Sequence, residues 1–325
     1  MTEKRFDVIG IGDPYQDLLV EVDRLPEHNQ KIRMHEWCFQ GGGNVPTAMA
    51  MAGTLGLKVG VVSIVGDDML GNTAEADYKF NHVDTSHLIK VKGKRSNFSV
   101  CISERANVGK EFICKAGNFP PLGVKDLDED YIRSARMIHI GEFTEAILTA
   151  ARWIHEEGGK VSIDAAYYRP DIYENYEHID IFIGSEDYYR ELCKDKGFTP
   201  SDYRTAMEYV KAQGPEIVVF TFGPDGCKGV YEDRYFEVPA FKVDVVDSTG
   251  AGDVFHGAFV YAYLQGWNPE KSARFCSGAS AIKCTRLGGR AGIPTLPVLE
   301  RFLETGEIDY TEIDERVNFY CAGTY

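Results

Sequence analysis

Residues 247–259 read Asp-Ser-Thr-Gly-Ala-Gly-Asp-Val-Phe-His-Gly-Ala-Phe, a glycine-rich loop that runs directly into an amphipathic helix. Small residues let a ligand approach the backbone closely, and the first N–H groups of a helix have no carbonyl partner within it. The backbone of Gly250, Ala251 and Gly252 is therefore a candidate site for an anion such as a phosphate. Asp253 is the exception, because a carboxylate beside a phosphate needs a chemical role. Accepting a proton from an attacking hydroxyl is such a role, so Asp253 is the candidate general base.

Around this loop, short runs of β-branched residues alternate with helical patterns along the chain. This alternation is typical of an α/β fold in which helices cover both faces of a mostly parallel sheet. Buried strands are expected at residues 7–11, 59–65, 137–140, 161–164, 181–183 and 217–221. Helices are expected at residues 46–55, 69–80, 146–157, 203–213, 251–265, 269–284 and 296–303.

Two segments, residues 20–40 and 96–118, lack the helical period. The second predicts a hairpin, because apolar side chains alternate on each arm around a turn at residues 105–109. Both segments are expected to form strands of a small sheet beside the main one. Such a sheet closes over a ligand as a lid, or pairs with its copy in a second subunit.

Two further segments offer polar groups to a ligand. Asp13 and Asp17 follow the first expected strand, and ligands of open α/β sheets bind beyond the carboxyl ends of the strands. Carboxylates accept hydroxyl hydrogen bonds and suit a sugar, although Asp is also common in solvated turns. The run Gly41–Gly43 leads directly into a helix, where Asn44 and Thr47 add side-chain donors and acceptors. A flexible link is the alternative, and the direct entry into a helix favours a ligand loop.

Taken alone, the loop at residues 247–253 also fits ordinary helix capping. In combination with other motifs it is far more specific. In chain order these motifs are Gly42-Gly43-Asn44 before a helix ending in Leu55-Gly56, then Val65-Gly66-Asp67-Asp68 with Gly71, then Thr221-Phe222-Gly223 with Gly226, and finally Asp247 to Asp253. Together they resemble the ribokinase-like carbohydrate kinases, also called the PfkB family, over nearly the whole chain. The resemblance implies a ribokinase-like α/β/α sandwich with a mostly parallel central sheet and a small β-sheet lid.

The resemblance also implies ATP-dependent phosphorylation of a sugar hydroxyl with Mg²⁺. Asp253 becomes the general base, and the backbone of residues 250–252 becomes the anion hole for the transferring phosphoryl group. The sugar-contacting positions of the family correspond to Asp17, Gly42, Gly43 and Asn44, and Asp13 and Thr47 are neighbours that we add to this set. One kinase domain is expected over residues 1–325, with lid segments at about 15–40 and 95–118 inserted in the α/β core.

On the nucleotide side the chain departs in part from the family pattern. Gly223 and Gly226, with Thr221, resemble the nucleotide loop. The usual Asn-x-x-Glu is replaced by Ser185-Glu186-Asp187-Tyr188, in which the carboxylates are present but shifted. We expect Glu186 to serve Mg²⁺ through water, because Mg²⁺ keeps much of its hydration. The usual Asp-x-Asn has become Asp164-Ala165-Ala166. A monovalent cation such as K⁺ often activates similar kinases, and Asp247 with residues 284–289 occupies the matching region.

Composition limits the partners. The 325 residues carry a formal net charge of −15, which argues against nucleic acid or an anionic membrane surface as the main partner. The N-terminal residues lack an apolar signal core, and the eight cysteines are scattered without a zinc pattern. We therefore expect a cytoplasmic protein that binds a small sugar and ATP, and that forms a homodimer through the lid.

Other functions fit less well. A dinucleotide-dependent oxidoreductase is suggested by Gly10-x-Gly12, but Tyr15 stands where the third glycine of that motif belongs. A kinase-fold sensor that binds without catalysis is a second alternative, favoured by the altered segment at residues 185–188 and opposed by Asp253. The expected enzyme is a carbohydrate kinase whose acceptor stays open among hexoses, ketoses, pentoses, nucleosides and inositol-like polyols.

Overall fold

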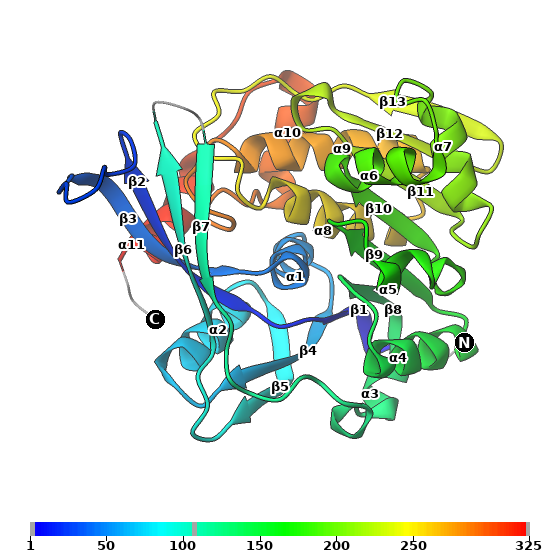
Figure 1. The fold of residues 1–325 in the computed structure, drawn as a ribbon, viewed down its shortest axis with the longest axis horizontal. Helices are drawn as coiled ribbons and strands as arrows, with labels where there is room; N and C mark the ends of the chain where they lie inside the picture. Colours follow the sequence, from blue (N-terminus) through cyan, green and yellow to red (C-terminus); the bar gives the residue numbers. More distant parts are fainter. Residues whose placement is uncertain (1–3, 106–108, 323–325) are drawn as a thin grey trace.

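The computed structural model describes residues 4–105 and 109–322. Its main element is a nine-stranded sheet with the order β13-β12-β11-β10-β9-β8-β1-β4-β5 (Figure 1). The strands from β11 to β5 run parallel to their neighbours, and β12 and β13 are added antiparallel at one edge. The strands are β1 Phe6–Ile11, β4 Val59–Gly66, β5 Val83–Val91, β8 Ala135–Ile140, β9 Lys160–Ala165, β10 Ile181–Ser185, β11 Ile217–Thr221, β12 Cys227–Tyr231 and β13 Arg234–Val238.

Alternate side chains of these strands enter two hydrophobic cores, one on each face of the sheet. In β10, Ile181 and Ile183 belong to one core and Phe182 to the other. The first core is covered by α1 Asn44–Thr54, α2 Met69–Phe80, α8 Ala251–Leu264, α9 Pro269–Lys283, α10 Leu296–Thr305 and α11 Thr311–Cys321. The second is covered by α3 Glu129–Arg133, α4 Glu145–Glu156, α5 Pro170–Tyr173, α6 Glu186–Lys196 and α7 Tyr203–Lys211. The architecture is therefore the expected α/β/α sandwich.

All six expected strands and all seven expected helices are present, with small differences at their ends. The sequence missed β5, the β12–β13 hairpin and helices such as α6. β5 is an edge strand that includes the partly exposed Asp84 and the exposed Ser86, so it lacks a continuous apolar run. α6 buries a narrow stripe and is otherwise charged, which hides its period among acidic and basic residues.

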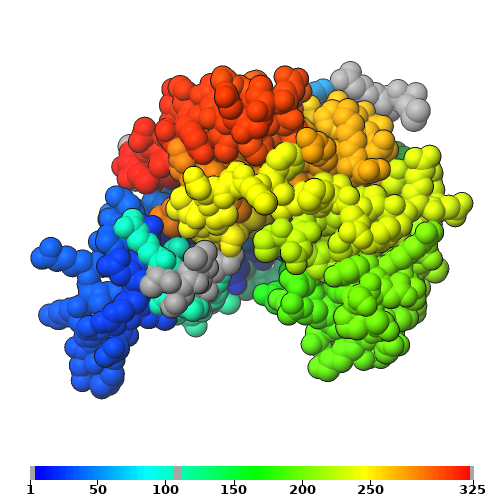
Figure 2. Space-filling view, turned by 90° about the horizontal axis from the view of Figure 1, so that it is seen from above, coloured from blue at the N-terminus to red at the C-terminus, as the bar shows by residue number. Residues whose placement is uncertain are grey.

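A second sheet of four strands lies beside the first, in the order β3-β2-β6-β7 (Figure 1). Its strands are β2 Tyr15–Val22, β3 Met34–Gly42, β6 Asn97–Glu104 and β7 Gly109–Lys115. β2 and β6 are parallel, and the two outer pairs are antiparallel. The predicted hairpin is formed by β6 and β7, and residues 106–108 of its turn lie outside the described residues. Figure 2 shows a hollow between this sheet, in blue and cyan, and the green part of the core.

The two faces of the second sheet differ in composition. On the inner face, Leu19, Cys38 and Cys101 are buried against Leu287. Strand register places a different set of apolar side chains on the outer face, all of them at least partly exposed. This outer set consists of Leu18, Val20, Trp37, Phe39, Val100, Ile102 and Ile113. The sheet is therefore apolar on both sides, which is unusual for a sheet that faces water on one of them.

Across residues 4–105 and 109–322, the helices are too short or too polar to cross a bilayer.

Candidate active site

The acidic and glycine-rich segments converge at the carboxyl edge of the parallel strands. Asp13 follows β1, and the glycine loop Gly41–Gly43 comprises the last two residues of β3 and the residue before α1. A Cβ atom added to Gly43 would lie 3.1 Å from the carbonyl oxygen of Asp13. At the next loop, a Cβ on Gly141 would lie 2.8 Å from Nδ2 of Asn44. These close approaches bring the predicted substrate-side residues to one end of the sheet, where ligands of open α/β folds bind.

Asp17 and Gly42 occupy adjoining space that leaves no room for a side chain at residue 42. A Cβ on Gly42 would lie 2.0 Å from Oδ2 of Asp17. Oδ1 of the same carboxylate accepts a 2.5 Å hydrogen bond from Oγ of Ser99 in β6. Burial raises the pKa of Asp17, while the Ser99 hydrogen bond and the positive charge of Arg290 oppose the rise. The sequence placed Asp17 in a turn, but it lies within β2 because the chain re-enters a strand at Tyr15.

The pKa of Asp13 is shifted by its burial and by its neighbours. The backbone N–H of Ile64 donates a 2.8 Å hydrogen bond to Oδ1 of Asp13. Burial raises the pKa of Asp13 to about 6; the Ile64 N–H opposes this rise, and the charge of Glu142 adds to it. Asp13 therefore changes its charge near pH 6. Glu142, which follows β8, is a further carboxylate near the site that sequence reasoning missed.

A buried ion pair supports the glycine loop from behind. Arg290 and Asp77 contact each other with side chains that are 1% and 0% exposed. The hydroxyl of Tyr320 in α11 donates to Oδ1 of Asp77 at 2.7 Å, and Nη2 of Arg290 donates to the carbonyl of Gly42 at 3.2 Å. A Cβ on Gly41 would lie 2.0 Å from Oδ2 of Asp77. The loop therefore rests directly on the ion pair and needs glycine there.

Two polar side chains complete this support. Oε1 of Gln40 accepts the backbone N–H groups of Arg290 and Ala291 at 2.9 and 3.0 Å. Oγ1 of Thr47, which the sequence assigned to the substrate, accepts a 3.3 Å hydrogen bond from Nε of Arg290 and is buried. Sequence reasoning missed Arg290, Asp77 and Gln40. The available signal was Asp77, a carboxylate on the otherwise apolar buried face of α2.

The glycine-rich loop at residues 247–253 ends where α8 begins. Gly250 is the residue before the helix and has φ 73°, a left-handed conformation that favours glycine. A Cβ on Gly250 would also lie 2.8 Å from Cα of Gly289, whereas a Cβ on Gly252 would meet no atom within 4 Å. The backbone at Gly252 therefore faces open space, and Asp253 follows it in the first turn of α8. This geometry suits an anion approaching the helix N-terminus.

Asp247 ties this loop to the turn at residues 284–289. Its Oδ1 accepts the backbone N–H and the hydroxyl of Thr249 at 2.8 and 2.7 Å, and its Oδ2 accepts the N–H of Gly288 at 2.8 Å. Burial raises the pKa of Asp247, but the positive charge of Lys283 and these hydrogen bonds outweigh it, so the net pKa is lowered. Asp247 is thus a buried, ionised group at the base of the loop.

A cluster of buried polar side chains joins α8 to the substrate side. Nε2 of His256 lies 3.2 Å from Oδ1 of Asp164, and Asp164 also forms a side-chain hydrogen bond with Asn44. His139 lies beside His256, and burial together with the charge of His256 lowers the pKa of His139 to about 3, so this ring is neutral. Asp164 keeps a lowered pKa, because the His256 charge and hydrogen bond outweigh burial. The cluster orients Asn44, and sequence reasoning found neither histidine.

The expected nucleotide residues lie at the ends of β10 and β11, which are paired so that Ser185 is opposite Thr221. Ser185 begins α6, accepting the N–H of Tyr188 at 3.0 Å and donating to the carbonyl of Ala166 at 2.7 Å. Gly223 and Gly226 both have positive φ, at 53° and 82°, in the turn that joins β11 to β12. These residues are separated from β1 by β8 and β9. The two groups of expected ligand residues therefore lie on different parts of one sheet edge.

Metal ligands are sparse at this edge. Glu186 is partly exposed in the first turn of α6, and its Oε1 lies 2.5 Å from Nη2 of Arg190. Within the described ranges, no group of three or more His, Cys, Asp or Glu side chains is arranged to hold a metal ion. The donor set therefore fits a cation carried mainly by phosphate and water oxygens, which is how Mg²⁺ is commonly bound with nucleotides.

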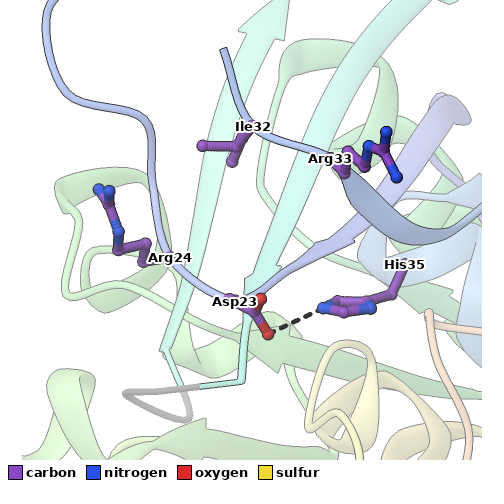
Figure 3. Close-up of a pocket in the computed structure, with 5 residues that line it drawn as sticks. All are labelled: Asp23, Arg24, Ile32, Arg33 and His35. Atoms are coloured by element: carbon purple, nitrogen blue, oxygen red, sulfur yellow. Dashed lines mark hydrogen bonds and ion pairs between the residues drawn. The ribbon is translucent and has the colours of Figure 1, made fainter. Parts of the chain in front are cut away.

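A cavity of about 370 Å³ lies elsewhere, at the far end of β2 and β3 (Figure 3). Its lining includes Arg24, Arg33 and an ion pair in which Nε2 of His35 lies 2.8 Å from Oδ1 of Asp23. These side chains are largely exposed, and the cavity is at the opposite end of β2 from Asp17. We therefore place the candidate active site at the glycine loops and not in this cavity.

A family model described as pfkB family carbohydrate kinase matches residues 7–296. The chain therefore belongs to the pfkB family of carbohydrate kinases and is a kinase of that class. The 5-dehydro-2-deoxygluconokinase of Clostridium perfringens is 26% identical over 339 residues, covering 97% of this chain and 97% of that protein. The nucleoside kinase of Methanothermobacter thermautotrophicus is 25% identical over 313 residues, covering 93% and 97%.

Solved structures share the fold. The crystal structure of a putative ribokinase II from E. coli in complex with ATP and Mg²⁺ superposes with a TM-score of 0.80 at 20% identity. The match covers 92% of this chain and 99% of that one. The ribokinase-like fold expected from the sequence is therefore confirmed.

The support of the glycine loop leads to a stability prediction. We expect Asp77→Ala to lower the free energy of unfolding by about 3–5 kcal/mol, because it leaves Arg290 buried without its partner charge. Urea unfolding followed by circular dichroism measures this loss. Glu75→Ala is the matched control on the same helix, where partly exposed ion pairs with Lys79 and Lys90 are worth about 0–1 kcal/mol. Equal losses in the two variants would contradict the role given to Asp77.

Proposed function

We propose that this protein transfers the γ-phosphoryl group of ATP to a hydroxyl of a small sugar or sugar-like polyol. One observation carries the proposal. The carboxylates of Asp13 and Asp17 and the loop at Gly41–Gly43 are grouped at the same sheet edge as the N-terminus of α8, which bears Asp253. This grouping supports separate binding groups for a polyhydroxyl acceptor and an anionic donor at one edge.

The chemical step follows from these positions. The carboxylate of Asp253 accepts the proton of the acceptor hydroxyl as its oxygen forms a bond to the γ-phosphorus. The bond from that phosphorus to the β,γ-bridging oxygen breaks, and ADP leaves. The backbone N–H groups at Gly250, Ala251 and Gly252 stabilise charge on the transferring phosphoryl oxygens, because helix N-termini hold fixed, preorganised dipoles. Asp13, Asp17 and Asn44 orient the acceptor, and Gly42 and Gly43 let it approach the backbone.

For the nucleotide side, we propose that Thr221, Gly223 and Gly226 contact ATP, with Ser185 shaping the adjacent loop. The support is their position at the ends of β10 and β11 and the ATP and Mg²⁺ in the similar ribokinase II structure. Mg²⁺ bound with ATP would neutralise phosphate charge, and Glu186 would hold it through water. The eight cysteines all lie within the described residues and are not joined in disulfides, which favours the cytoplasm as the site of this reaction.

The acceptor is best identified by a coupled assay of ADP release with ATP, Mg²⁺ and a panel of acceptors. The panel should include 5-dehydro-2-deoxygluconate, ribose, fructose, inositol and nucleosides, because the similar kinases from C. perfringens and M. thermautotrophicus carry such different names. A nucleoside acceptor is the second candidate, favoured by the latter relative. Acceptor binding without ADP release across the panel would favour the non-catalytic sensor and overturn the kinase proposal.

We also propose a homodimer in which two copies pack through the second sheet. The support is its outer face, where Leu18, Val20, Val100 and Ile102 are partly exposed in the two central strands. Contiguous apolar surface of this kind marks a contact with another protein surface. A second copy would cover it, leaving the inner face with Asp17 for the acceptor. The segments at about 15–40 and 95–118 would then serve as both lid and dimer contact.

The role of Asp253 leads to a kinetic prediction. We expect Asp253→Asn to lower kcat by about 10² to 10⁴ while leaving ATP affinity nearly unchanged, because the amide cannot accept the proton. Steady-state kinetics and equilibrium nucleotide binding measure the two effects. Asp244→Asn, an exposed position in the segment before the loop, is the control. Near-normal turnover in Asp253→Asn would remove it from the general-base role.

The raised pKa of Asp13 leads to a pH prediction. Below a pKa of about 6 its carboxyl group is protonated and loses acceptor capacity for substrate hydroxyls. Acceptor affinity should therefore weaken as pH falls through 6, approaching about tenfold per pH unit. Asp17 also has a raised pKa and would act in the same direction. Calorimetric titration with the acceptor alone checks this, and equal affinity at pH 5 and pH 7.5 would contradict it.

The dimer leads to a prediction on assembly. Val100→Glu places a charge in the centre of the outer face, so we expect a monomer in sedimentation velocity experiments. Phe112→Glu is the matched control, because register with Cys101 places residue 112 on the opposite face of the same sheet. A dimer that withstands Val100→Glu, or a wild-type protein that is monomeric, would show that another surface or no surface is used.

A further inference from the structure

Lys283 is a buried cation at the base of the anion-hole loop. It is the last residue of α9, and its side chain is 0% exposed. Nζ of Lys283 donates a 2.7 Å hydrogen bond to the backbone carbonyl of Asp247. A lysine is almost never fully buried unless it is paired, so this placement needs a reason.

The reason lies in the charge of Asp247. This residue is 4% exposed, and its pKa is held below the usual range by Lys283 and by the hydrogen bonds described above. The positive charge of Lys283 therefore compensates a negative charge that the loop has buried. The carbonyl and both carboxylate oxygens of Asp247 accept hydrogen bonds from Lys283, Thr249 and Gly288. The pair and its hydrogen bonds form one network beneath the loop.

This network fixes the geometry of the loop that meets the phosphoryl group. Gly288 holds Asp247, while the next residue, Gly289, contacts the left-handed Gly250. On the other side, Oγ of Ser280 in α9 donates to the carbonyl of Ala251 at 2.8 Å. The end of α9 and the turn after it therefore pack beneath residues 247–251 and hold them through these contacts. Lys283 provides a positive charge in this supporting segment.

A free monovalent cation does not fit this arrangement. Such an ion needs several oxygen ligands, and each carboxylate oxygen of Asp247 already accepts at least one hydrogen bond from an N–H or O–H donor. The ammonium group of Lys283 donates a hydrogen bond to the backbone carbonyl of Asp247, and its positive charge would repel a second cation. The suggestion of K⁺ at Asp247, made from the sequence, thus disagrees with the donor set.

We infer that Lys283 is a tethered cation that positions the anion-hole loop, so that phosphoryl transfer by this chain does not depend on K⁺. The inference rests on the proposed kinase function. Lys283 is a positioning residue, because it acts on the phosphoryl group through Asp247 and the 248–250 backbone. A covalently attached cation is always present, whereas a bound ion depends on its concentration.

The first test needs no variant. Wild-type rates are measured with the acceptor identified above in chloride salts of K⁺, Na⁺ and N-methylglucamine at equal ionic strength. The rates should agree within about twofold, which is the spread left by ordinary screening of surface charge. Larger activation by K⁺ would overturn the inference.

The second test removes the charge. Lys283→Ala should lower kcat by about 10², the scale of one preorganised electrostatic contact, with little change in the KM for the acceptor. K⁺, ammonium or methylammonium should then restore part of kcat in this variant, and Lys283→Arg should retain more activity than Lys283→Ala. Lys271→Ala removes an exposed charge from the same helix and is the matched control, with unchanged kcat and no response to cations.

The outcomes separate the two proposals. A wild-type protein that releases no ADP with any acceptor contradicts the kinase function itself. An active wild type combined with a Lys283→Ala variant whose lost kcat no cation restores would mean a purely structural role, and it contradicts only the inference. Thermal melting of each variant identifies unfolding, and in that case the cation dependence of the wild type decides the question alone.

Discussion

The ion pair between Arg290 and Asp77 connects segments that are far apart in the sequence. It reaches Gly42 and Thr47 on one side and Tyr320 on the other, and it fills the space that a side chain at Gly41 would need. Because both charges are fully buried, each is stable only with the other in place. The Gly41–Gly43 segment is therefore packed against a buried ion pair and hydrogen-bonded to it, unlike a flexible glycine linker.

The buried carboxylates in the two parts of the candidate site have pKa values shifted in opposite directions. At Asp13 and Asp17, burial dominates and raises the pKa, although each carboxylate accepts a hydrogen bond, from Ile64 and Ser99 respectively. On the phosphoryl side, Asp247 is saturated with donors and its pKa falls. The first kind of carboxylate is suited to binding, and the second to holding a loop in shape.

The sequence predicted the sandwich because its strands are apolar runs and its helices have a clear period. It also supplied candidates for ligand contact, since glycine loops and acidic turns are local signals. It missed Arg290, Lys283 and His256, because their importance depends on partners 36 to more than 200 residues away, such as Asp247 and Asp77. It assigned Thr47 to the substrate for the same reason, as its bond to Arg290 is invisible in local sequence.

The hydrogen bond from Tyr320 to Asp77 has a consequence for the order of folding. The glycine loop at residues 41–43 leaves the ribosome early, but its supports arrive with residues 290 and 320, and Tyr320 lies beyond the residues matched by the family model. The N-terminal part of a chain is made first, but a domain generally folds as a unit. The Gly41–Gly43 segment is consequently among the first parts of the chain to be made, yet the buried Asp77 beneath it receives the hydrogen bond of Tyr320 only after α11 has been synthesised.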